Sequence, residues 1–292
     1  MNDRIQVSET TFKTVDGVTL FERSWVLDEP KSVILICHGI AEHSGRYDHV
    51  ARSLCSSGFA VVAFDLRGHG KSSGKRTYID RFSDYLDDLG DVLDRVKKGY
   101  PKVPVFLLGH SMGGGIIALY AMERNPEVQG LLLSAPAAKV SEDLSPFLQK
   151  ISGVLSAIAP KLPVLKLDNS FISKDPKVME DYDNDPLNYR DKLLARTGSE
   201  ILETTRKISA GCDAIDLPIL IMHGKADKLT DISGSQMLYD KVSSQDKTLK
   251  LYDGLYHEIL NEPEQDMVKA DIIDWLDQHI QPLTTEITES TE

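Results

Sequence analysis

A serine lies between two glycines in the segment GHSMG at residues 109–113, a G-x-S-x-G pattern. The apolar residues 105–108 before it are typical of a buried strand, and residues 116–124 after it are typical of a helix. Small glycines permit a sharp strand-to-helix turn that lifts a serine hydroxyl above the end of a sheet. The pattern predicts that Ser111 is a catalytic nucleophile, and the alternative is a tight turn whose serine caps the helix.

A serine hydroxyl needs a base to take its proton and an acid to orient that base. After a turn of this kind, the acid and then the histidine follow in the chain, each in the loop behind a later strand. Asp227 and His257 occupy the loops after the last two predicted strands, so we predict that they complete a catalytic triad with Ser111. The alternatives are a solvated turn aspartate, with Asp231 as the rival acid, and a surface histidine.

Attack on a carbonyl places negative charge on its oxygen, which backbone N–H groups can stabilise. One expected donor is the amide of Met112, directly after the nucleophile. The second is expected in the loop after the strand at 33–37, and we assign it to Ile40. His38 and His110 are expected to flank the pocket as substrate contacts or supporting donors, because neither follows an acid in the required order.

Strands and helices alternate around these residues. Residues 11–26 alternate around Asp16-Gly17, which predicts an antiparallel hairpin at one edge of a sheet. The later strands are predicted at 33–37, 60–65, 105–108, 130–136, 217–224 and 248–253, and the helices at 48–57, 82–98, 116–124, 232–241 and 263–279. This order predicts an α/β fold with a mostly parallel twisted sheet flanked by helices.

The alternation stops between residues 137 and 212, where no strand is predicted. We interpret 137–212 as a helical cap over the carboxyl ends of the strands, 1–136 and 213–280 as the core, and 281–292 as a disordered acidic tail. The cap carries an apolar stripe at helical spacing, made of Phe147, Leu148, Ile151, Val154, Leu155 and Ile158. The stripe either packs the cap onto the core or touches lipid aggregates.

Composition excludes several classes of protein. The formal net charge of -12 argues against nucleic acid as a partner, because a phosphate backbone requires clustered Lys and Arg. The 3 cysteines form no C-x-x-C pair and are expected to be reduced, buried thiols of a cytosolic protein. We expect neither a signal peptide nor a bilayer-spanning segment. No His or Cys spacing indicates a metal, and nothing indicates an oligomeric state.

The motifs and their order resemble those of monoacylglycerol lipases and the lysophospholipase-like serine hydrolases grouped with them. The similar segments are HGIAEHSGRY, FDLRGHGKSSG, PVFLLGHSMGGG, NDPL, HGKADKLTD and SQDKTLKLYDGLYHEILNE. The resemblance extends from about Asp16 to His279. It implies an α/β-hydrolase fold with a helical cap, activity on esters of single long acyl chains, and no cofactor.

The same resemblance implies roles for four further residues. Glu42, Arg46 and His110 stand where the family contacts the glycerol head group, and Tyr182, just before NDPL, matches a cap tyrosine. For Glu42 and Arg46 the alternative is a solvated salt bridge within a loop.

The predicted reaction is therefore hydrolysis of monoacylglycerols through an acyl-enzyme. The alternatives are a lysophospholipase or broad carboxylesterase, an acyltransferase, for which His43 and Asp48 supply an H-x-x-x-x-D spacing, and a non-enzymatic ligand-binding member of the fold. The expected location is the cytoplasm, with transient contact between the cap and a membrane or lipid aggregate as an addition.

Overall fold

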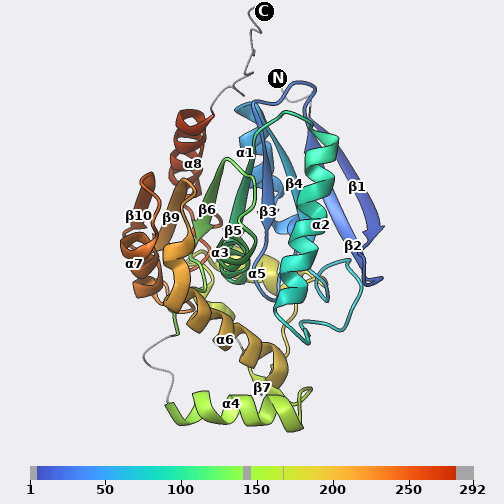
Figure 1. Cartoon of the computed structure of the whole chain (residues 1–292), viewed down its shortest axis with the longest axis vertical. Coiled ribbons are helices and arrows are strands. Elements are labelled where there is room, and N and C mark those ends of the chain that lie inside the picture. Colours follow the sequence, from blue (N-terminus) through green and yellow to red (C-terminus); the bar gives the residue numbers. More distant parts are fainter. Residues whose placement is uncertain (1–4, 141–145, 167, 281–292) are drawn as a thin grey trace, which may run out of the picture.

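An eight-stranded sheet forms the middle of the computed structural model, which describes residues 5–140, 146–166 and 168–280 (Figure 1). Its strands follow the order β1-β2-β4-β3-β5-β6-β9-β10. Their bounds are Gln6–Lys13 (β1), Thr19–Val26 (β2), Ser32–Cys37 (β3), Phe59–Asp65 (β4), Val105–His110 (β5), Gly130–Ser134 (β6), Ile219–Gly224 (β9) and Lys247–Tyr252 (β10). The strands from β4 to β10 in this order are parallel to one another, whereas β2 runs antiparallel to both of its neighbours, β1 and β4. The β1–β2 hairpin lies at one edge, as predicted.

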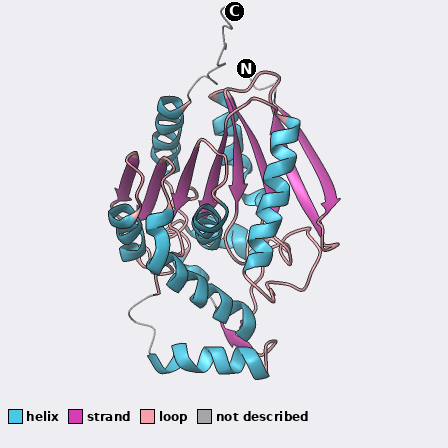
Figure 2. Cartoon of the chain, viewed as in Figure 1, coloured by secondary structure: helices cyan, strands magenta, loops and turns pink. Residues whose placement is uncertain are grey.

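Helices cover both faces of this sheet (Figure 2). Their bounds are Asp48–Ser56 (α1), Ser83–Gly99 (α2), Met112–Arg124 (α3), Pro146–Ile158 (α4), Pro176–Asn184 (α5), Ala195–Gly211 (α6), Ile232–Lys241 (α7) and Gln265–His279 (α8). Buried residues of α1 and α8 belong to one hydrophobic cluster, and those of α2, α3 and α7 belong to another. The predicted α/β-hydrolase fold is confirmed, with the ends of its core elements shifted by a few residues.

The sequence of β3 shows why the sheet is covered on both faces. All its residues are buried. Val33 and Leu35 contact the cluster of α2 and α3, whereas Ile34 and Ile36 contact the cluster of α1 and α8. Because successive side chains of a strand point to opposite faces, an uninterrupted apolar run can fill two cores at once.

Between β6 and β9 the chain forms α4, α5 and α6 and two short strands, β7 (Pro163–Leu165) and β8 (Leu193–Leu194), which pair antiparallel. The prediction that this region has no strand was wrong. The two strands could not be recognised in the sequence, because segments of three and two residues are too short to show an alternating pattern. Figure 1 shows α4, α6 and β7 beyond the lower end of the sheet. The cap boundaries at 137 and 212 remain a prediction.

The apolar stripe of α4 divides in two. Val154 and Ile158 are 56% and 75% exposed, so they do not pack on the core. Leu155 lines the cavity described below. The side chains of Phe147, Leu148 and Ile151 lie outside the described residues, as does the tail at 281–292.

The predicted state of the cysteines is confirmed, since Cys37, Cys55 and Cys212 are all free and buried. Over the ranges described, none of the helices has the length and apolar character needed to cross a bilayer.

Candidate active site

Ser111 lies at the sharp turn between β5 and α3, with φ 52° and ψ -117°. A positive φ is uncommon for a residue other than glycine and stores strain. Backbone hydrogen bonds hold the turn, because Ser111 N–H donates to the Ser134 carbonyl at 2.9 Å and the Ser111 carbonyl accepts from Ala137 N–H at 2.9 Å. The hydroxyl therefore sits on a fixed, strained backbone at the end of the sheet.

The two glycines of the motif are required by close approach. A Cβ at position 109 would lie 2.5 Å from the carbonyl oxygen of Gly113. A Cβ at position 113 would lie 2.6 Å from the carbonyl oxygen of His38 and still closer to that of Cys37. The start of α3 thus runs directly against the end of β3, which leads into the loop that carries Ile40.

The predicted acid and base are in contact. His257 donates from Nδ1 to Asp227 Oδ2 at 2.7 Å, which leaves its Nε2 available as a base. The Asp227 carboxylate is fully buried and also accepts from Leu229 N–H at 2.7 Å, from the Thr230 hydroxyl at 2.8 Å and from His223 Nε2 at 3.0 Å. These donors fix the carboxylate in one orientation, and through it the imidazole ring.

The rival acid, Asp231, has a structural role. It is the N-cap of α7, and its carboxylate accepts from Ser233 N–H at 2.9 Å. A helix N-cap satisfies an amide that has no acceptor within the helix. The geometry therefore favours Asp227 over Asp231 as the partner of the histidine.

The pKa values of the site follow from burial and neighbouring charge. Burial opposes ionisation of Asp227, but His257 and His223 hold its pKa well below the usual range. Burial lowers the pKa of His257, yet the Asp227 carboxylate raises it above 6.5 overall. Burial and the neighbouring His257 lower the pKa of His110 to about 4, so His110 is neutral at pH 7. Its ring lies 4.7 Å from that of His257, centroid to centroid.

The two predicted oxyanion donors, Ile40 and Met112, line one cavity together with Ser111 and His257. Met112 is the first residue of α3, so its N–H has no acceptor within the helix and lies at the positive end of the helix dipole. Gly39 precedes Ile40, and a Cβ there would lie 3.2 Å from that of Ser111. The loop that carries Ile40 therefore passes close to Ser111.

The cavity has a volume of about 500 Å³ and is lined by both polar and apolar side chains. Its polar lining includes Glu42 and Glu258 from loops of the core, His110 from the end of β5 and Tyr182 from α5. Its apolar lining comes mainly from the region between β6 and β9 and includes Val140, Leu155, Val164, Leu165, Leu193, Ile201 and Leu202. Such a cavity suits a molecule that has both a polar and an apolar part.

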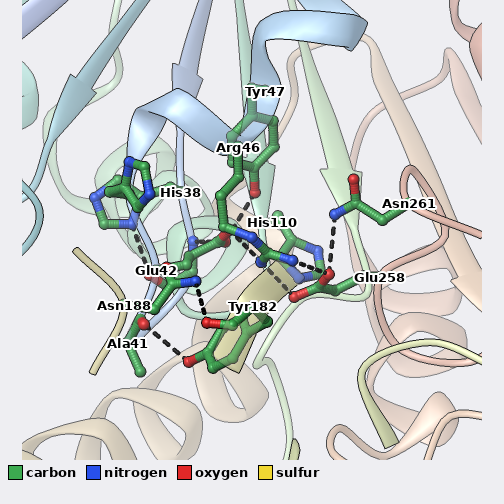
Figure 3. A network of polar contacts seen from close by, with 12 residues as sticks. His38, Ala41, Glu42, Arg46, Tyr47, His110, Tyr182, Asn188, Glu258 and Asn261 are labelled. Carbon is green, nitrogen blue, oxygen red and sulfur yellow. Dashed lines mark hydrogen bonds and ion pairs between the residues drawn. The ribbon is translucent and has the colours of Figure 1, made fainter. Parts of the chain in front are cut away.

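Arg46 is the centre of a polar network beside the cavity (Figure 3). Its guanidinium binds both carboxylate oxygens of Glu258 at 2.6 and 2.7 Å, and one of Glu42 at 3.0 Å. It lies 4.9 Å from the centroid of the Tyr182 ring. Burial opposes the charge on Glu42, but Arg46 and His110 lower the pKa of that carboxyl to about 2. The Glu42–Arg46 pair is therefore ionised and buried, not solvated.

The four residues predicted to contact the head group lie close together, but not all of them line the cavity. Glu42, His110 and Tyr182 line the cavity, whereas the lining does not include Arg46, whose side chain is 10% exposed. Contact of any of the four with a head group remains a prediction. The presence of Glu258 in the cavity lining was not predicted from the sequence. It could have been predicted from its position directly after His257 in the chain.

Two other histidines have structural partners. His38 is fully buried, accepts from Leu66 N–H at Nε2 and donates from Nδ1 to the Gly39 carbonyl at 2.7 Å, so it supports the loop from behind and does not line the cavity. His43 donates from Nε2 to Asp185 at 2.8 Å, whereas Asp48 accepts from the Trp25 indole. The H-x-x-x-x-D spacing therefore does not form a pair, and the geometry gives acyl transfer no support.

Comparison with known proteins agrees with this geometry. The model of the family described as "Serine aminopeptidase, S33" matches residues 28–264. The chain belongs to this family. It is a serine hydrolase with the α/β-hydrolase fold.

Relatives of this hydrolase cover nearly all of its chain. It is 38% identical over 274 residues to a monoacylglycerol lipase of Mycolicibacterium smegmatis, covering 94% of this chain and 98% of that one. It is 37% identical over 244 residues to the monoglyceride lipase of Homo sapiens, covering 83% and 80%. The crystal structure of a Paleococcus ferrophilus monoacylglycerol lipase superimposes with a TM-score of 0.79 at 29% identity, over 94% of this chain and 100% of that one.

Proposed function

We propose that this serine hydrolase is a monoacylglycerol lipase, which cleaves monoacylglycerols to a fatty acid and glycerol. The observation that carries the proposal is the cavity at Ser111, whose lining combines polar side chains such as Glu42 and His110 with many apolar ones. The names of the relatives support the same substrate.

The reaction proceeds in two stages through an acyl-enzyme. Ser111 attacks the ester carbonyl while His257 takes its proton, and the amides of Ile40 and Met112 stabilise the oxyanion. Glycerol then leaves with the proton from His257. A water molecule activated by the same histidine releases the fatty acid, and Asp227 stays ionised throughout and holds the imidazole in one tautomer.

The head group accepted by the site is neutral. Two carboxylates, Glu42 and Glu258, line the cavity and share the guanidinium of Arg46. Carboxylates accept hydrogen bonds from hydroxyl groups and repel phosphate. This charge arrangement favours glycerol over the phosphorylated head of a lysophospholipid.

A panel of esters tests the assignment. The purified protein is given 1-monoacylglycerols of several chain lengths beside di- and triacylglycerol, lysophosphatidylcholine and a short soluble ester. We expect the highest kcat/KM for a monoacylglycerol, and equal rates on all of them would refute it. Labelling by a fluorophosphonate that is lost in Ser111→Ala, but kept in the matched variant Ser170→Ala on the exposed surface, separates an enzyme from a binding protein.

We further propose that the exposed end of the cap contacts lipid aggregates. Large apolar side chains are exposed along α4, β7 and the turn between them, namely Val154, Ile158, Leu162, Val164 and Leu165. Val164 and Leu165 also line the cavity, so the exposed apolar surface continues into it. Exposed apolar side chains gathered in neighbouring segments of the chain are typical of a lipid-binding face.

Charged substitutions at Val154 and Ile158, which do not line the cavity, test this surface. We expect Val154→Glu/Ile158→Glu to reduce sedimentation with phosphatidylcholine vesicles and to slow cleavage of micellar but not monomeric monoacylglycerol. The control is Val15→Glu, at a position 96% exposed in the β1–β2 turn. An unchanged ratio of micellar to monomeric rates would exclude docking through this surface.

A further inference from the structure

The carbonyl oxygen of Ala41 accepts two hydrogen bonds from the segment around α5. The Tyr182 hydroxyl lies 2.9 Å from it, and Tyr189 N–H donates to it at 2.9 Å. Figure 3 shows the Tyr182 hydroxyl pointing to Ala41. A segment about 140 residues away in sequence is thus attached to the loop that carries the Ile40 amide.

Ala41 has a strained backbone. Its φ is 66°, in the left-handed region that residues with a Cβ rarely adopt. Such a conformation persists only where surrounding contacts hold it. On the other side of Ile40, Gly39 N–H donates to Glu42 at 2.6 Å. Hydrogen bonds therefore hold the loop on both sides of the Ile40 amide, at the peptide group directly before it and at the Ala41 carbonyl two peptide groups after it, where Tyr182 supplies one of the donors.

Tyr182 is itself held in place. Its ring lies against the Arg46 guanidinium, and its backbone carbonyl accepts from the Asn188 side chain at 3.0 Å. Burial raises the pKa of the Tyr182 hydroxyl, so the group remains a hydrogen-bond donor at neutral pH. A second acceptor, the carbonyl of Tyr189, lies 3.3 Å from the same hydroxyl. The hydroxyl is thus directed at backbone carbonyls of the protein.

We propose that Tyr182 is a positioning residue for the oxyanion loop, which acts by holding the carbonyl of Ala41 so that the Ile40 N–H points to the reacting oxygen. The inference rests on the proposed function only in taking Ile40 as an oxyanion donor. It goes beyond a head-group contact, because a positioning role acts on every ester that Ser111 attacks, whether or not the ester carries glycerol.

Tyr182→Phe tests the role, because it keeps the ring over Arg46 and removes only the hydroxyl. The matched control is Tyr189→Phe, in which the lost hydroxyl bonds the Lys192 carbonyl at 3.1 Å and the backbone N–H to Ala41 is kept. Both variants and the wild type are assayed with a monoacylglycerol and with p-nitrophenyl acetate, which has no glycerol. Active sites are titrated with a fluorophosphonate, so that kcat refers to folded enzyme alone.

We expect kcat to fall about tenfold in Tyr182→Phe on both esters, because an oxyanion donor that is no longer held in place stabilises the transition state less. A tenfold fall in rate corresponds to ~1.4 kcal/mol of transition-state stabilisation. KM is expected to stay within about twofold of wild type. Inhibition by a trifluoromethyl ketone, which forms an oxyanion at Ser111, is expected to weaken in proportion. Tyr189→Phe is expected to match wild type.

A rise in KM confined to the monoacylglycerol would overturn the proposal and make Tyr182 a head-group contact. Unchanged kinetics on both esters, or equal losses in the two variants, would overturn it as well. Failure of the wild type to cleave monoacylglycerol would refute the proposed function, yet the p-nitrophenyl acetate comparison would still decide the role of Tyr182.

Discussion

Gly113 is the position at which one added methyl group is expected to do the most damage. The start of α3 lies so close to β3 that an alanine Cβ at 113 would be 2.6 Å from the His38 carbonyl oxygen and nearer still to that of Cys37. Both neighbours are backbone atoms, which cannot rotate away as a side chain can. Gly113→Ala must therefore move the helix, the strand end or both.

The size of the shift can be worked out from the contact. Ordinary van der Waals contact begins at about 3.4 Å, so the gap to His38 must open by about 0.8 Å, and the gap to Cys37 by more. Overpacking of this kind costs roughly 3 kcal/mol, and at ~2–4 °C per kcal/mol the melting temperature falls by roughly 6–12 °C. A displacement near 1 Å between a nucleophile and its oxyanion donors costs on the order of 100-fold in rate.

The assay combines thermal melting followed by circular dichroism with kcat/KM on a p-nitrophenyl ester, expressed per fluorophosphonate-labelled site. The control is Gly99→Ala, at the exposed end of α2, where a new Cβ meets nothing within 4 Å. We expect that control to stay within about 1 kcal/mol and to keep full activity. If Gly113→Ala behaved like Gly99→Ala, the close approach of α3 to β3, and the reasoning built on it, would be refuted.

Two further predictions concern ionised groups. With His257 as the proposed base, activity requires its neutral form and is expected to fall as the pH drops through its pKa. Asp227→Asn removes the charge that raises this pKa, so it is expected to shift the acid limb of the kcat/KM profile to lower pH and to reduce kcat by roughly 10⁴-fold. An unshifted limb, or an equal loss of kcat in the control Asp231→Asn, would contradict this. The pKa of Glu42 is about 2 in the folded protein against 4.5 unfolded, so its contribution to stability is lost as pH falls from about 4.5 to 2. The free energy of unfolding, measured by urea denaturation at a series of pH values, should therefore depend less on pH between about 4.5 and 2 in Glu42→Gln than in the wild type. An identical dependence on pH in the two proteins would count against the prediction.

The sequence alone was sufficient for the features whose causes are local. The turn at Ser111 is predictable because only glycine tolerates the close approaches at positions 109 and 113. The core strands are predictable because a continuous apolar run can serve two faces of a sheet. The loops that carry Asp227 and His257 follow from the order of strands, since parallel strands bring their carboxyl ends to one edge.

Contacts between segments that are distant in the chain could not be predicted from the sequence. The pairing of Arg46 with Glu258 spans 212 residues, and a long charged side chain has many acidic partners available in a chain with 45 acidic residues. The strands β7 and β8 were not predicted, because they are too short to show an alternating pattern of apolar and polar residues. Only the three-dimensional arrangement of the loops decides which partner lies within hydrogen-bonding distance.

The loop at Ala41 combines a feature that the sequence predicted with features that only the folded structure determines. The sequence predicted that Ile40 supplies an amide there, because the loop follows a central strand. It did not predict that Ala41 takes a positive φ or that Tyr182 holds its carbonyl. An unfavourable backbone conformation has no local cause in the alanine itself, so it depends on contacts that exist only after the chain has folded.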